Sequence, residues 1–176
     1  MGCDKALLPI PGSKLLLWQR QLRVLEDMRP REIFWSGPAR PGLPGSLRLV
    51  SDAVKNAGPL AGLSACLNLL ESDLLVAMAV DLPRIDASFL QKLLAQCSPA
   101  IGVVCQRGDF FEPLAAIYPR GFRVLAAEHL AQRHHRLQDL VREAVQQGLL
   151  RIVSLGEEDM VLFKNMNSPD DLNGGF

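Results

Sequence analysis

Leu74-Leu75-Val76-Ala77-Met78-Ala79-Val80 is the stretch that decides the fold, and Asp81-Leu82-Pro83 follows it directly. An unbroken apolar run of this length is typical of a central parallel strand that is buried on both faces. The run is far too short to span a bilayer as a helix. We therefore expect an α/β protein in which this strand lies within the sheet.

Strand and helix patterns alternate on both sides of this run. The other predicted strands are 32–36, 47–50, 100–105, 114–118, 149–155 and 161–164. The predicted helices are 13–27, 60–70, 87–96, 121–130, 137–147 and a short helix opened by Pro169. Ser13 is predicted to cap the first helix, Asp86 to cap the third, and Gly148 to end the fifth. Such alternation predicts a doubly wound, mostly parallel, three-layer α/β sheet. The 176 residues are enough for a single domain, 1–176, with a sizeable core.

Composition excludes several classes of function. The chain has 48% apolar and 22% charged residues, with 19 Lys plus Arg against 19 Asp plus Glu. Zero net charge argues against a nucleic-acid binder or a membrane-surface binder, because both need a net basic field. The four cysteines, at 3, 66, 97 and 105, have no C-x-x-C spacing. They therefore indicate reduced thiols of a cytoplasmic protein and neither a disulfide framework nor a zinc site.

Polar residues follow predicted strands at the edge where α/β sheets bind ligands. Asp81 comes directly after the strand 74–80. A carboxylate there can hold Mg²⁺ beside a triphosphate, or it can simply end the strand before a proline turn. Asp52 follows the strand 47–50 and precedes Gly58-Pro59-Leu60-Ala61-Gly62. Glycines at a helix start let the backbone approach a ligand, although an ordinary turn has the same composition.

The two ends of the chain contain further candidate residues. Gly2-Cys3-Asp4-Lys5 followed by apolar residues suits the trailing half of a phosphate-binding loop. Asn165 and Asn167, two apart on extended chain, can present two carboxamides to a ligand, or form Asx turns before Pro169. Glu112, in Glu112-Pro113-Leu114, can point toward the same cleft or lie in an exposed loop.

These segments, in this order, resemble the molybdenum cofactor guanylyltransferases, which belong to the nucleotidyltransferases with a Rossmann-like sheet. The resemblance rests on 2–8, Asp52 with 58–62, Asp81-Leu82-Pro83, 112–114 and Asn165-Met166-Asn167-Ser168-Pro169-Asp170-Asp171-Leu172, and it covers nearly the whole chain. It implies transfer of GMP from GTP to the terminal phosphate of molybdopterin, with Mg²⁺ and release of pyrophosphate. The implied partners are GTP, molybdopterin or molybdenum-molybdopterin, and other cofactor-maturation proteins or apo-molybdoenzymes.

The resemblance also implies roles for individual residues. Gly2 and Lys5 would contact the GTP phosphates, and Asp81 would bind Mg²⁺. Asn165 and Asn167 would face the reacting centre. The nucleotide would be lined by Ser36, Asp52, Gly58, Pro59, Leu60 and Gly62. Catalysis would thus depend on Lys5, Asp81, Asn165 and Asn167.

One departure from the family pattern keeps other functions open. Family members begin with a strand that runs into Leu-Ala-Gly-Gly and an arginine before the Met-Gly pair, whereas this sequence starts at that Met. We therefore expect an N-terminally incomplete domain. The alternatives to a guanylyltransferase are a molybdopterin cytidylyltransferase or another nucleotidyltransferase, and a non-catalytic remnant that binds nucleotide without turnover.

Overall fold

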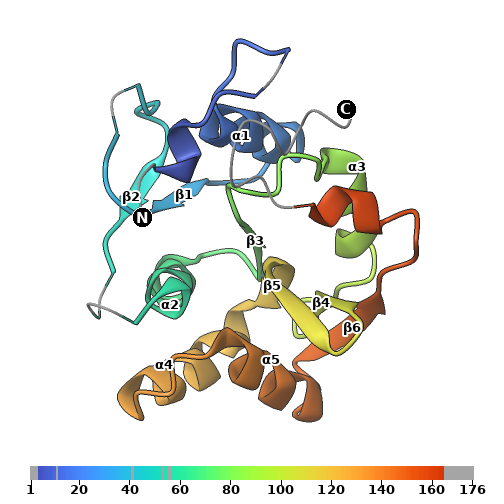
Figure 1. The fold of residues 1–176 in the computed structure, drawn as a ribbon. Helices are drawn as coiled ribbons and strands as arrows, with labels where there is room; N and C mark the ends of the chain where they lie inside the picture. Colours follow the sequence, from blue (N-terminus) through green and yellow to red (C-terminus); the bar gives the residue numbers. More distant parts are fainter. Residues whose placement is uncertain (1–3, 11, 41, 53, 55–56, 165–176) are drawn as a thin grey trace.

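The computed structural model describes residues 4–10, 12–40, 42–52, 54 and 57–164. It contains a two-stranded sheet and a four-stranded sheet of order β3-β5-β4-β6 (Figure 1). The strands are β1 Phe34–Ser36, β2 Arg48–Val50, β3 Leu74–Met78, β4 Gly102–Arg107, β5 Phe110–Pro119 and β6 Leu150–Ser154. β1 pairs with β2 in parallel and β4 pairs with β6 in parallel, while β5 is antiparallel to both β3 and β4. β3, β4 and β6 consequently run in the same direction.

Helices cover both faces of the larger sheet, as expected for three layers (Figure 1). On one face α2 (Pro59–Leu69), α4 (Arg123–Ala131) and α5 (Leu137–Gln146) pack in a core around Tyr118 and Phe122. On the other face α1 (Leu17–Asp27), α3 (Ala87–Leu94) and the 3₁₀ turn η3 (Met160–Phe163) pack around Ile85 and Ile117. Two shorter 3₁₀ turns, η1 (Lys5–Leu7) and η2 (Arg120–Phe122), complete the described elements.

The prediction that the run 74–80 is buried on both faces is wrong. Every residue of β3 is half-buried, and the only pairing partner that the described residues give β3 is β5. An apolar run indicates that a strand is shielded from water, but it does not show which strands and helices pack against it. β3 nevertheless runs parallel to β4 and β6, so its carboxyl end reaches the same edge of the sheet as theirs.

Local signals gave mixed results. Asp86 caps α3 as predicted: its carboxylate accepts a hydrogen bond from the Phe89 N–H at 2.8 Å, and this bond chiefly lowers the pKa of Asp86. Gly148, with φ of 73°, ends α5 as predicted. Ser13, however, does not cap α1, because its hydroxyl accepts from the Leu15 N–H and the helix begins only at Leu17.

Residues 161–164 do not form the predicted strand. Val161 lies in η3, whose Phe163 is buried against Phe89 at a ring-centroid distance of 5.6 Å. A short apolar segment packs equally well as a 3₁₀ turn, so periodicity could not separate the two structures. The helix expected at Pro169 lies outside the described residues.

Gly102, at the start of β4, lies very close to the backbone of β5. A Cβ atom on this buried glycine would lie 1.9 Å from the carbonyl oxygen of Ile117 and 2.9 Å from its carbonyl carbon. Both atoms belong to the backbone of β5 and cannot rotate away. Only glycine fits this position.

None of the described helices is both long enough and apolar enough to cross a membrane.

Candidate active site

Asp81 lies in the turn that follows β3, at the carboxyl edge of the larger sheet. Gln21 of α1 holds this turn: its Nε2 donates to the carbonyl oxygens of Ala79, at 2.9 Å, and Leu82, at 2.8 Å. Gln21 is 96% buried, since only 4% of its surface is exposed. Ala79 and Leu82 lie on either side of Asp81 in the chain. Gln21 of α1 therefore holds the stretch of backbone that carries the Asp81 carboxylate.

Lys5 lies opposite this carboxylate. Its Nζ donates to Asp81 Oδ2 at 3.0 Å, and the two side chains are 44% and 22% exposed. The N–H of Ala6 donates to Asp4 Oδ1, which caps η1, and Asp4 also pairs with Arg40. The sequence prediction that Lys5 and Asp81 act together is therefore consistent with the geometry, which brings them into direct contact.

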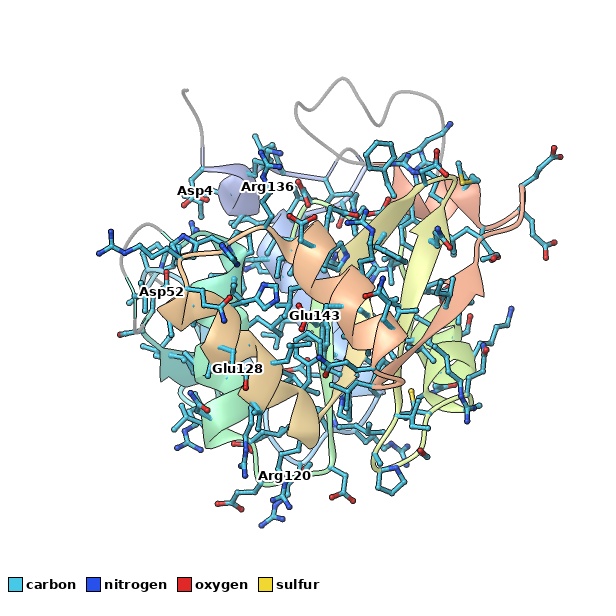
Figure 2. The ribbon with its side chains drawn as sticks, turned by 90° about the horizontal axis from the view of Figure 1, so that it is seen from below. Asp4, Asp52, Arg120, Glu128, Arg136 and Glu143 are labelled. Carbon is cyan, nitrogen blue, oxygen red and sulfur yellow. The ribbon has the colours of Figure 1, made fainter. Side chains whose placement is uncertain are left out.

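The predicted nucleoside residues form a second group beside β1 and β2. A Cβ on Gly62 would meet the Ser36 hydroxyl oxygen at 2.0 Å and Asp52 Oδ1 at 3.4 Å. Gly62 thus brings the end of β1, the chain after β2 and the first turn of α2 into contact. Figure 2 shows Asp4 and Asp52 on the same side of the molecule.

The start of α2 has features of a close-approach turn. Gly58 has φ of 61° and ψ of −153°, a conformation that side-chain-bearing residues rarely adopt. Pro59 occupies the first turn, where its missing N–H costs nothing, and Leu60 is fully buried. No side chain caps this helix start, and within the turn the Ala61 N–H donates to the Gly58 carbonyl oxygen at 3.1 Å.

With the residue roles that the family resemblance implies, Gly62→Ala should weaken GTP binding about tenfold while the protein stays folded. The added methyl group forces the Ser36 hydroxyl away, which removes one hydrogen-bonding group from the nucleoside side. Alanine is up to about 1 kcal/mol better than glycine in a helix, which offsets part of the crowding cost. Isothermal titration with GTP and thermal melting measure both effects. Gly121→Ala, where a Cβ has open space, is the matched control; GTP binding equal to that of the parent protein contradicts the prediction.

Glu112 also lies at this edge of the sheet. The sequence had left open whether it points toward the cleft or lies in an exposed loop. The last hydrogen bond between the β3 and β5 segments runs from the Ala79 N–H to the Leu114 carbonyl oxygen at 2.7 Å, so Asp81 and Glu112 each lie two residues beyond it. Burial raises the pKa of Glu112, the Arg107 guanidinium lowers it and the Asp81 carboxylate raises it again. Arg107 Nη2 is 3.2 Å from Glu112 Oε1. Sequence reasoning did not single out Arg107, whose one visible signal is its place before the Gly108-Asp109 turn.

The buried thiols have no nucleophilic character. Burial raises the pKa of Cys66 to about 11 and that of Cys105 to about 12, so both are protonated at neutral pH. Within the described ranges no group of three or more His, Cys, Asp or Glu side chains could hold a metal ion by itself. A metal at this site would need ligand oxygens from a bound substrate in addition to Asp81.

Some predicted residues cannot be placed. Gly2, Asn165 and Asn167 lie outside the described residues. The described candidates fall into two neighbouring groups: Lys5 with Asp81, and Ser36 with Asp52 and the 58–62 turn. This arrangement places one cation and one carboxylate beside a glycine-lined helix start, which suits a nucleoside triphosphate with a divalent cation.

Comparison with known proteins agrees with this geometry. A probable molybdenum cofactor guanylyltransferase of Opitutus terrae is 35% identical over 176 residues, which cover 97% of this chain and 86% of the relative. A molybdenum cofactor guanylyltransferase of Pseudomonas putida strain GB-1 is 33% identical over 98% of this chain and 88% of its own length.

Solved structures share the fold at lower identity. The molybdopterin-guanine dinucleotide biosynthesis protein A of Archaeoglobus fulgidus superposes with a TM-score of 0.71 and 19% identity, over 98% of this chain and 89% of that one. A 2-C-methyl-D-erythritol 4-phosphate cytidylyltransferase of Thermus thermophilus superposes with a TM-score of 0.70 and 15% identity, over 96% and 90%. These likenesses confirm the expected Rossmann-like nucleotidyltransferase fold. Because residues 1–148 match the MobA-like NTP transferase domain, the chain belongs to this family of nucleotidyltransferases.

Proposed function

We propose that this protein is a molybdenum cofactor guanylyltransferase, which transfers GMP from GTP to the terminal phosphate of molybdopterin and releases pyrophosphate. The observation that carries the proposal is the contact between Lys5 and Asp81 beside the Ser36, Asp52 and Gly62 group. The relatives' names give the acceptor. The cysteines of the described residues are free thiols, which suits the cytoplasm. The acceptor can be molybdopterin or molybdenum-molybdopterin. Other proteins of cofactor maturation would supply this acceptor or receive the product.

In this mechanism the nucleoside lies against Ser36, Asp52 and the turn from Gly58 to Gly62. The turn at Gly58 is open, since a Cβ there would meet no atom within 4 Å, and it leaves room for the nucleoside. The missing Cβ of Gly62 lets the Ser36 hydroxyl lie against α2, where it can bond to the nucleoside. Gly2 belongs with the phosphate-binding segment that continues into Lys5, and Asn165 and Asn167 are assigned to the reacting centre.

The phosphates lie between the nucleoside group and the Lys5–Asp81 pair. Asp81 would hold Mg²⁺, because this ion prefers one or two carboxylates together with phosphate oxygens. When bound, Mg²⁺ neutralises charge on the phosphates. Lys5 then points its ammonium group at the triphosphate, where it stabilises the negative charge that builds up on the leaving pyrophosphate.

The chemical step itself makes few demands on the side chains. An oxygen of the acceptor's phosphate monoester attacks the α-phosphorus of GTP, and the bond from this phosphorus to the α–β bridging oxygen breaks. The nucleophile is already an anion, so no general base is required. Positioning and charge neutralisation supply the rate, as in other phosphoryl transfers.

The direct test is to incubate the purified chain with molybdopterin, Mg²⁺ and either GTP or CTP, and to identify the product by mass. We expect molybdopterin guanine dinucleotide and pyrophosphate, with GTP preferred over CTP. A cytosine product at higher rate would make the protein a cytidylyltransferase. Nucleotide binding without any product would support a non-catalytic remnant.

A further inference from the structure

Four charged side chains form a row along the carboxyl edge of the larger sheet. Lys5 pairs with Asp81 at 3.0 Å, and Arg107 pairs with Glu112 at 3.2 Å. The Asp81 carboxylate is near enough to Glu112 to raise its pKa, so the two ion pairs lie beside each other at this edge. The Arg107 pair lies on the β4 side, because Arg107 is the last residue of β4.

Glu112 is fixed by a β-bulge in β5. Cys105 of β4 pairs with Glu112, while the preceding Val104 pairs with Ala116, so residues 113–115 are extra on β5 at this point. Bulges re-aim side chains and are common beside active sites. A proline within a strand is also typical of a bulge, and here it is Pro113.

Two partly buried contacts hold the residues on either side of Glu112. The hydroxyl of Tyr118, which is fully buried, donates to the carbonyl oxygen of Pro113 at 2.7 Å. Gln138 of α5 clamps Phe111: its Oε1 accepts from the Phe111 N–H at 3.0 Å and its Nε2 donates to the Phe111 carbonyl at 2.8 Å. The Glu112 carboxylate is thereby pre-positioned, and it orients the Arg107 guanidinium in turn.

Arg107 is placed to meet a ligand from solvent. It is the last residue of β4, directly before the Gly108-Asp109 turn, so it lies at the carboxyl edge where α/β sheets bind ligands. Its side chain is 48% exposed, whereas that of Glu112 is only 20% exposed. The carboxylate thus forms a partly buried support, and the guanidinium remains accessible.

The proposed reaction needs a cation at this place. The acceptor brings a second phosphate against the triphosphate, and its approach is opposed by like-charge repulsion unless a positive group compensates. The nucleoside occupies the side of β1, β2 and α2, so the acceptor must reach the α-phosphorus from the side of β5 and β4. Arg107 lies on that side, and its planar guanidinium can donate two parallel hydrogen bonds to two oxygens of one phosphate.

We infer that Arg107, oriented by Glu112, binds the terminal phosphate of the acceptor and so helps to select phosphorylated acceptors. This inference rests on the proposed function, because it assumes a phosphate-bearing acceptor beside Asp81. Glu112 acts here as a positioning residue. Arg107 is the group that touches the substrate.

The test compares Arg107→Gln with two control variants. Arg107→Lys keeps the charge but loses the bidentate fork. Arg120→Gln removes an exposed arginine near the amino end of β3, on the far side from Asp4 in Figure 2. KM values for molybdopterin and for GTP are measured separately, and equilibrium dialysis measures molybdopterin binding without GTP.

We expect Arg107→Gln to raise KM and Kd for molybdopterin about tenfold or more, as for a lost charge-assisted hydrogen bond, with KM for GTP unchanged. The KM and Kd of Arg107→Lys for molybdopterin should lie between those of Arg107→Gln and those of the parent protein. The values of Arg120→Gln should equal those of the parent protein. Unchanged molybdopterin binding in Arg107→Gln overturns the inference, and so does a parallel rise in both KM values. If the parent protein transfers nothing, the proposed function fails, and dialysis alone still decides whether Arg107 binds molybdopterin.

Discussion

Replacing Asp81 by asparagine is expected to lower the rate of GMP transfer by about two orders of magnitude or more, because a metal's contribution to charge stabilisation is worth several kcal/mol. Asparagine keeps the size of the side chain and can still bond to Lys5, but it lacks the negative charge that, in the proposed mechanism, holds Mg²⁺. The fold should survive. The Lys5–Asp81 pair is partly exposed, and such pairs contribute only about 0–1 kcal/mol to stability.

Two measurements separate the chemistry from the structure. Titration with Mn²⁺ in the presence of GTP should show weakened metal binding, and thermal melting should show an almost unchanged Tm. Asp73→Asn is the matched control, since Asp73 is an exposed aspartate just before the amino end of the same strand. An Asp81→Asn protein with full turnover would remove Asp81 from the mechanism.

The second large effect is expected for Gly102→Ala, which should destabilise the fold by about 3 kcal/mol or more, at the upper end of overpacking effects. The new methyl group would collide with the backbone of Ile117, so β4 and β5 must separate or shift their register. For a chain of this size the corresponding fall in Tm is about 10 °C.

Gly45→Ala provides the comparison, because a Cβ on Gly45 meets no atom within 4 Å. Thermal and urea denaturation of the two variants give the difference directly. A Gly102→Ala protein as stable as the Gly45→Ala protein would mean that β4 and β5 do not approach as closely as described. Loss of structure should also abolish the Arg107–Glu112 pair, since these residues lie on the same two strands.

Signals confined to a few neighbouring residues predicted several helix ends, although Ser13 does not cap α1 as expected. Asp86 caps its helix, Pro59 opens α2, and Gly148 ends α5, because each effect depends on backbone geometry within one turn. The contact of Lys5 with Asp81 joins residues far apart in the chain. The sequence did not predict this contact; the family resemblance implied only that Lys5 contacts the GTP phosphates and that Asp81 binds Mg²⁺.

The sequence could not predict features that depend on how strands pair or on which elements pack against a strand. The half-buried environment of β3 depends on its neighbours, and the bulge at Pro113 depends on the pairing of β5 with two strands at once. Gln21 looked like one more polar residue of a helix, yet it is buried and bonded to the turn at Asp81. Periodicity records burial along one element and says nothing of such contacts between elements.

Tyr118 gives the chain an internal optical reporter, because it is the only tyrosine in the sequence and is fully buried. Burial raises the pKa of its phenol far above the ordinary value, so the native state holds the neutral form. As the pH rises above about 10, an unfolded chain ionises its tyrosine and a folded one does not. Native stability should therefore decline in alkaline solution, and the ultraviolet absorbance of tyrosinate should report the fraction of molecules whose sheet has opened.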